Sequence, residues 1–218
     1  MGSSESRLTP LQSDLLAAFF EHTQRFFLTG GGALAAYYLH HRDTRDLDLF
    51  ASGDVDIAEG VRALAEAAVA IGATARILQE SGDFKRFSVS RGEALTLVDL
   101  VIDRAPQVNA TKAAYGKVLV DQPGEIAANK LCALLDRTEV RDLVDLKLLL
   151  ASGLQLSDVV RDAQRKHMGA DPATLAWVLS QSRPVAAAVV PEGMSPAEID
   201  AFREELIAEL TRMAVPKE

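Results

Sequence analysis

The spacing of apolar residues divides the chain into two parts of different structural character. Up to about residue 122, short apolar runs typical of strands alternate with segments in which apolar residues recur at helical spacing. Beyond residue 122 the spacing is almost entirely helical. The pattern therefore predicts an α+β protein, with a mixed α/β domain over residues 1–122 and an all-α domain over residues 123–218.

The first part is predicted to begin with a helix and to continue mainly as strands. Thr9-Pro10-Leu11-Gln12 has the features of a helix start, with a capping threonine, proline in the first turn and glutamine in the capping-box position. Further helices are predicted over residues 33–39 and 56–70. Strands are predicted over residues 25–29, 47–50, 74–78, 84–89, 95–102 and 117–120, with a hairpin turn at Arg91-Gly92-Glu93.

The second part is predicted to be a series of helices. They cover residues 125–137, 141–150, 157–167 and 172–182. Ser195-Pro196-Ala197-Glu198 is a second capping box, and it predicts a final helix that ends near residue 213.

Composition limits the compartment and the partners. The formal net charge of −8 provides no global basic field to attract nucleic acid, although a local groove could offset it with Lys85, Arg86, Lys112, Lys117 and Lys130. Cys132 is the only cysteine, so no intrachain disulfide can form. No apolar run reaches the roughly 20 residues that span a bilayer, and residues 1–10 lack a secretory signal pattern. We therefore expect a cytoplasmic protein without a membrane partner.

The most informative pattern is a glycine run followed by two aspartates at alternate positions. Gly30-Gly31-Gly32 lies between a predicted strand and a predicted helix, where glycine lets the backbone turn tightly and approach a phosphate. Asp46 and Asp48 project to the same face of a strand, and paired carboxylates suit Mg²⁺. Together the two features indicate nucleotide chemistry. The alternatives are an ordinary turn at the glycines and a solvated turn with weak ion pairs at the acids.

A third carboxylate lies in the middle of an apolar strand. Asp99 is flanked by Val98 and Leu100, and a buried carboxylate requires a partner. It either joins a metal site and accepts a proton from an attacking hydroxyl, or it pairs with a neighbouring arginine such as Arg86. The residues alone leave both alternatives open.

The helical part contains a second group of charged residues. Lys130 lies in a run of mainly apolar and small residues, 126–135, and Asp142 and Asp145 are three positions apart on the following helix. A lysine in such a run could reach a nucleotide phosphate as a compact charge. The alternative is an ordinary amphipathic hairpin with Arg–Asp pairs.

Taken in order, these motifs resemble those of a known family. The segments that carry the resemblance are Gly30-Gly31-Gly32-Ala33-Leu34, Arg42-Asp43-Thr44-Arg45-Asp46-Leu47-Asp48-Leu49-Phe50, Val98-Asp99-Leu100, residues 130–137 and Arg141-Asp142-Leu143-Val144-Asp145-Leu146. They are similar to those of the AbiEii/AbiGii-type nucleotidyltransferase toxins, a branch of the polymerase-β-like nucleotidyltransferase superfamily. The resemblance covers about residues 26–150. It implies a small polymerase-β-like sheet with flanking helices, followed by a helical domain.

The resemblance also implies an activity and partners. Such enzymes transfer a nucleoside monophosphate from an NTP to an acceptor in a metal-dependent reaction, and tRNA is the acceptor of some members. The partner is typically a winged-helix antitoxin. Carried over by position, the ligands of Mg²⁺, or of Mn²⁺ in its place, are Asp46, Asp48 and Asp99. These three and Lys130 are the implied catalytic residues. The implied nucleotide-binding residues are Thr29, Gly30, Gly31, Gly32, Lys130, Asp142 and Asp145.

Two positions depart from the family pattern. Gly31 stands where many superfamily members have serine, and Gly32 stands where this branch often has threonine. A hydroxyl that would contact the γ-phosphate is then missing, unless Thr29 supplies it.

The leading hypothesis from the sequence is an NTP-dependent nucleotidyltransferase that acts on RNA as the toxin of a toxin–antitoxin pair. One alternative is a transferase that modifies a small hydroxylated acceptor, such as an aminoglycoside. Another is a non-catalytic module that binds a nucleotide or a partner. The presence of Asp46, Asp48 and Asp99 argues against this last alternative.

Overall fold

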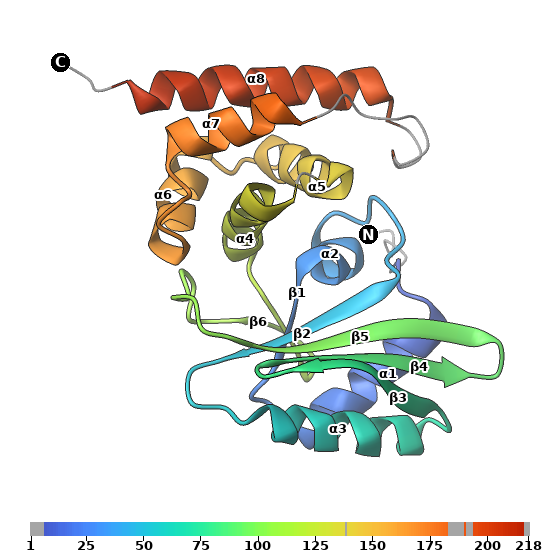
Figure 1. The fold of residues 1–218 in the computed structure, drawn as a ribbon. Coiled ribbons are helices and arrows are strands. Elements are labelled where there is room, and N and C mark those ends of the chain that lie inside the picture. Colours follow the sequence, from blue (N-terminus) through green and yellow to red (C-terminus); the bar gives the residue numbers. More distant parts are fainter. Residues whose placement is uncertain (1–6, 138, 183–189, 191–193, 216–218) are drawn as a thin grey trace. The chain divides into compact units, whose positions relative to one another are not determined.

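The chain forms two compact units, residues 1–122 and residues 123–218 (Figure 1). The computed structural model describes residues 7–137, 139–182, 190 and 194–215. The first unit is a sheet with helices on its faces, and the second is helical. The change from one to the other occurs at Pro123, where the helical spacing of the sequence begins.

A seven-stranded mixed sheet forms the framework of the first unit, in the order β3-β4-β5-β2-β1-β7-β6. Its strands are β1 (Phe27–Thr29), β2 (Asp46–Ser52), β3 (Thr74–Ser81), β4 (Phe84–Arg91), β5 (Ala94–Asp103), β6 (Ala113–Tyr115) and β7 (Val118–Val120). The β2–β5 and β1–β7 pairs are parallel, and the other neighbouring strands are antiparallel. The expected hairpin is present, because β4 and β5 pair antiparallel around Gly92. The short strand β6 was not predicted from the sequence, because Ala113-Ala114-Tyr115 lacks the β-branched residues that mark a strand such as β7.

One face of the sheet is covered by two helices, and this layer is the core of the unit. The helices are α1 (Pro10–His22), which starts with the predicted capping box, and α3 (Ile57–Ala70), which is capped by Asp56. They pack against each other and on the sheet (Figure 1). Leu47, Leu49 and Leu100 point into this layer and are fully buried. Because side chains alternate along a strand, the residues between them face the opposite side.

The helix after β1 begins at the glycines themselves, not at Ala33 as the sequence predicted. Gly30 to Ala33 form the first turn, α2, and Leu34 to Tyr38 continue as a π-helix, η1. The chain leaves η1 through His40, whose φ of 50° is the only positive φ of a non-glycine residue in the described part of the chain. The glycine run is therefore part of a helix that lies on the face of the sheet opposite α1 and α3 (Figure 1).

The second unit is built around α4 (Pro123–Asp136), which contacts three other helices. These are α5 (Val140–Ala151), α6 (Leu156–Lys166) and α7 (Pro172–Gln181). The last helix, α8 (Pro196–Ala214), packs on α5 and α7 and starts with the predicted capping box at Ser195. Among the described residues of both units, no helix has the length and apolar character needed to cross a membrane.

Candidate active site

Three carboxylates lie together on the face of the sheet opposite α1 and α3. Asp46 and Asp48 are two residues apart on β2, and Asp48 pairs in register with Asp99 on the parallel strand β5. Paired residues of neighbouring strands point to the same face, so all three side chains leave the sheet on the side away from α1 and α3. The Leu–Asp alternation of β2 places two acids there, because the leucines are held in the core.

Asp99 is paired with an arginine in this structure. Arg86, its register partner on β4, donates from Nε to Oδ1 at 2.7 Å and from Nη2 to Oδ2 at 2.6 Å. The hydrogen bond with Asp99 raises the pKa of the Arg86 guanidinium, and the charges of Asp99, Asp46 and Asp48 add to this effect. The arginine that the sequence suggested as a partner of Asp99 is therefore present, and the metal role of Asp99 stays a prediction.

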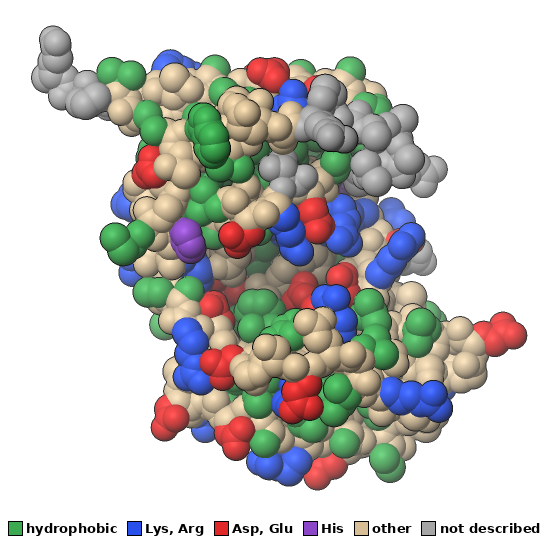
Figure 2. Space-filling view, in the orientation of Figure 1, with side chains coloured by type: hydrophobic (Ala, Val, Ile, Leu, Met, Phe, Trp, Pro, Cys, Tyr) green, Lys and Arg blue, Asp and Glu red, His purple; other side chains and the backbone are tan. Residues whose placement is uncertain are grey.

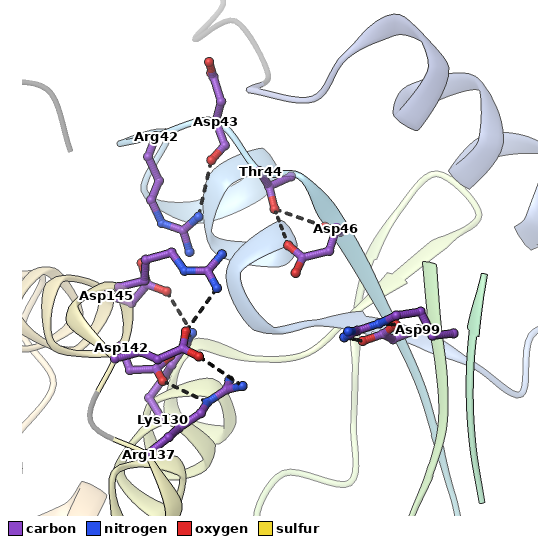
Figure 3. Close-up of polar contacts among 12 residues, drawn as sticks. Arg42, Asp43, Thr44, Asp46, Asp99, Lys130, Arg137, Asp142 and Asp145 are labelled. Atoms are coloured by element: carbon purple, nitrogen blue, oxygen red, sulfur yellow. Dashed lines mark hydrogen bonds and ion pairs between the residues drawn. The ribbon is translucent and has the colours of Figure 1, made fainter. Parts of the chain in front are cut away.

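Metal binding at these carboxylates stays a prediction, and Asp46 and Asp48 are the two that share one strand. Among the described residues, no group of three His, Cys, Asp or Glu side chains is arranged to hold a metal ion. Asp46 Oδ1 accepts a long hydrogen bond of 3.4 Å from the Thr44 hydroxyl (Figure 3). Two adjacent carboxylates fit Mg²⁺, which is usually held by one or two acids together with substrate phosphates. The role of Asp99 as a third ligand stays a prediction, and in this structure Arg86 lies directly across from it.

Gly30 brings the backbone against the acid pair. Its φ is +62°, and a Cβ at this position would lie 2.4 Å from Asp48 Oδ2. Only glycine accepts both the left-handed backbone and the close approach without strain. The glycine turn and the Asp48 carboxylate thus lie in close contact, and a side chain at position 30 would fill the space between them.

A positive charge lies over the next glycine. A Cβ on Gly31 would come within 2.4 Å of Arg42 Nη2, so the guanidinium lies directly against the glycine turn. Arg42 also donates from Nη1 to the Asp43 carbonyl (Figure 3). Gly32 packs on β2, because a Cβ there would lie 3.4 Å from the Asp46 carbonyl oxygen. The glycine turn therefore has a cation beside it.

Thr29, which precedes the glycine turn, belongs to a buried polar network. It is buried, and its hydroxyl donates to Asp121 Oδ2 at 2.7 Å. Asp121 also accepts from Lys112 at 2.6 Å, and the Lys112 ammonium lies 4.0 Å from the centre of the Phe27 ring. In this structure the single hydroxyl proton of Thr29 is thus used within a buried network, and its role in binding a nucleotide stays a prediction.

Within the helical unit, Lys130 is held by both predicted acids. Its ammonium lies 2.6 Å from Asp142 Oδ1 and 2.9 Å from Asp145 Oδ2 (Figure 3). The lysine side chain is 12% exposed, and the two acids are buried. Burial alone would lower the pKa of Lys130, but the charges of Asp145 and Asp142 outweigh it and raise the pKa above its usual value. Lys130 therefore stays charged at neutral pH.

One oxygen of this cluster lacks a hydrogen bond. Asp142 Oδ2 is buried without a hydrogen-bond partner in the described part of the chain, and Arg137 Nε lies 3.6 Å from it. A buried acceptor in this state is costly.

The sequence matches the family model for the nucleotidyl transferase AbiEii toxin of type IV toxin–antitoxin systems over residues 14–215. The chain belongs to the AbiEii toxin family. It is therefore an NTP-dependent nucleotidyltransferase of a toxin–antitoxin system, and the family implies a cognate antitoxin. Comparison with curated protein sequences finds no match.

Solved structures share the fold of this AbiEii-family chain. JHP933 from Helicobacter pylori has 20% sequence identity and a TM-score of 0.59, with 95% of this chain and 94% of that one covered. A putative nucleotidyltransferase from H. pylori has 19% identity and a TM-score of 0.57, with 93% and 94% covered. MenT4, a nucleotidyltransferase toxin from Mycobacterium tuberculosis H37Rv, has 20% identity and a TM-score of 0.59, with 95% and 87% covered.

The basic residues that the sequence offered for a nucleic-acid groove are each paired with an acid in this AbiEii-family chain. The ion pairs are Lys85–Glu80, Arg86–Asp99, Lys112–Asp121, Lys117–Glu21 and Lys130–Asp142. On the face drawn in Figure 2, acidic and basic side chains are interspersed. The toxin therefore has less positive field for an acceptor than its lysine and arginine count suggests.

Sequence reasoning assigned no separate role to Arg42, although the arginine was part of the family motif. Its position four residues before Asp46 was the available signal. The Thr29–Asp121–Lys112 network had no such signal, because its members lie up to 92 positions apart.

Proposed function

We propose that this toxin transfers a nucleoside monophosphate from an NTP to a hydroxyl of RNA, with tRNA as the acceptor, in a reaction that depends on Mg²⁺. Mn²⁺ is the expected substitute. The observation that carries the proposal is the alignment of Asp46, Asp48 and Asp99 on one face of the sheet, with Gly30 against the Asp48 carboxylate. This arrangement combines a place for a phosphate with acids for a divalent ion.

The N-terminal unit would bind the triphosphate through its backbone and one cation. Asp46 and Asp48 would hold the ion, which when bound neutralises phosphate charge and orients the reacting groups. The glycine turn would let the phosphates come close to the backbone, and Arg42 beside Gly31 would meet their negative charge. The Arg42 guanidinium thereby takes the part of the serine that is missing from position 31.

Asp99 would act on the acceptor hydroxyl. The acceptor oxygen forms a bond to the α-phosphorus, the bond between that phosphorus and the bridging oxygen of the β-phosphate breaks, and pyrophosphate leaves. Asp99 would take the hydroxyl proton, because a carboxylate keeps acceptor positions beyond the two that Arg86 uses. Lys130 would bind the NTP phosphates, positioned by Asp142 and Asp145.

The test uses each labelled NTP with Mg²⁺, total RNA and the purified full chain. We expect label in tRNA, and we expect Asp46→Asn and Asp48→Asn to abolish it while they leave thermal unfolding unchanged or slightly higher, since like-charge repulsion is relieved. Asp43→Asn is the matched control, because Asp43 precedes the same strand but is 84% exposed. Near-normal labelling by either active-site variant in saturating Mg²⁺ would show that the metal assignment is wrong.

A small hydroxylated acceptor is the second candidate, supported by the net charge of −8 and the pairing of the basic residues. The same assay with an added aminoglycoside separates the two. Label on the aminoglycoside but not on RNA would replace the RNA proposal. We place the reaction in the cytoplasm, because NTPs and tRNA are found there.

A further inference from the structure

A row of charged side chains crosses three neighbouring strands on the face that carries the site. Arg86 on β4 is in register with Asp99 on β5, and Asp99 is in register with Asp48 on β2. The arginine forks both oxygens of Asp99, at 2.7 and 2.6 Å. The row thus has the Arg86 cation at one end and the acid pair at the other.

The two hydrogen bonds from Arg86 occupy the Asp99 oxygens that a divalent ion would also need. The Asp99 side chain is 8% exposed, so its charged form needs a cation or hydrogen-bond donors beside it. A bidentate guanidinium covers both carboxylate oxygens, which are the atoms that an ion would coordinate. An ion and Arg86 therefore cannot both hold Asp99 in full.

Arg86 has room to leave Asp99 without disturbing the core. Its side chain is 38% exposed, and its guanidinium carbon already lies 5.7 Å from the ring centre of Phe84, two residues away on the same face of β4. The ring offers a second favourable position for the guanidinium.

We propose that Arg86 is a built-in cation that competes with a second divalent ion for Asp99. The resting enzyme then holds one ion, at Asp46 and Asp48, and a second ion binds only when Arg86 releases Asp99. This inference rests on the proposed function for the identity of the metal site. Arg86 is thus a positioning residue, which acts on the reaction through Asp99.

The test titrates the purified full chain with Mn²⁺ alone and follows free Mn²⁺ by electron paramagnetic resonance. We expect Arg86→Gln to tighten the second Mn²⁺ site about tenfold or more, since one opposing positive charge is removed. Arg86→Lys should tighten it less, because lysine keeps the charge but cannot fork both oxygens. Asp99→Asn in the Arg86→Gln background should remove the gain.

Arg104→Gln is the matched control. Arg104 forks Asp83 at 2.8 and 2.9 Å, with the same geometry but on an exposed surface, so its loss should leave Mn²⁺ binding unchanged. Circular dichroism checks that each variant is folded. If Arg86→Gln does not fold, the Mn²⁺ titration of Arg86→Lys tests the proposal in its place.

Two results would overturn the proposal. In the first, the folded Arg86 variants bind Mn²⁺ with the affinity of the wild type. In the second, the higher Mn²⁺ affinity of Arg86→Gln persists when Asp99→Asn is added. Labelling of RNA by the wild type is measured separately, so these results can occur while the proposed function stands. Absence of Mn²⁺ binding in every variant would overturn both the competition and the metal assignment.

Discussion

At the scale of single residues, Gly30 allows the glycine turn to lie against the acid pair. Its left-handed φ and its approach to Asp48 are two separate demands on one position. Gly72 meets only the first demand, because its φ is +67° and nothing lies within 4 Å of its absent Cβ. Substitution of Gly72 therefore measures backbone strain alone, whereas substitution of Gly30 also affects the site.

We expect Gly30→Ala and Gly72→Ala each to lower the free energy of unfolding, by about 1–3 kcal/mol and about 1 kcal/mol respectively. Only Gly30→Ala should abolish nucleotidyl transfer, because its methyl group displaces the Asp48 carboxylate. Urea unfolding and the labelling assay measure the two effects. A fully active Gly30→Ala enzyme would contradict the role given to this turn.

Lys130 has a structural role as well as the proposed role in binding phosphate. Lys130→Met removes the buried cation that Asp142 and Asp145 share, which should cost about 3–5 kcal/mol. Lys166→Met is the control, since Lys166 forms a similarly buried pair with Glu125 in the same unit. Both variants should lose stability, but only Lys130→Met should lose affinity for a non-hydrolysable NTP. Equal NTP affinity in the two would remove Lys130 from the site.

The stabilisation by Lys130 should persist to alkaline pH. Its pKa is raised in the folded chain, so the folded state holds the proton more tightly than the unfolded state. The stabilisation is then complete below the ordinary lysine pKa of about 10.4 and is lost as the pH rises through the folded pKa. The difference in unfolding free energy between wild type and Lys130→Met should stay constant from about pH 7 to 9 and shrink only above about pH 10.5.

At the scale of elements, the π-helix after the glycine turn ends in an unfavourable conformation. Leu39 and His40 both donate to the Leu34 carbonyl, and His40 then turns with a φ of 50°. Glycine is the usual residue at such a helix end. We expect His40→Gly to raise the free energy of unfolding by up to ~1 kcal/mol in a urea titration.

His41→Gly is the control for His40→Gly, because His41 has no positive φ. It should lower stability by about 0.5–1 kcal/mol, since glycine adds freedom to the unfolded chain. A loss of stability in both variants would show that the His40 ring matters more than its backbone.

The elements that the sequence predicted well are those with a clear period or cap. Both capping boxes and the β4–β5 hairpin are present, because local side chains determine them. The start of α2 was misplaced, because glycine has a low helix propensity and tertiary packing overrides it here. The pairing of Arg86 with Asp99 depends on strand register, which a single sequence does not encode locally.

At the scale of the whole molecule, the pairing of basic residues predicts how an RNA acceptor would bind. If most lysines and arginines are already neutralised, few counterions are released from RNA when it binds. We expect a plot of log KM for tRNA against log salt concentration to have a slope equivalent to fewer than about three phosphate contacts. A slope that corresponds to six or more would show that these pairs open to form a basic groove.

The order of the strands also affects when the enzyme becomes active during its synthesis. The strands β3, β4 and β5 form a local meander, but β2 must wait for β5, and β1, which pairs with β2, gains its second neighbour only with β7 near the end of the first unit. Pairings between distant segments form late, because the intervening chain must first be closed into a loop. A ribosome-bound chain that ends before β7 therefore has the acids of the site but no complete sheet to hold them. Toxicity should appear only with chains long enough to include β7, which protects the cell from incomplete products.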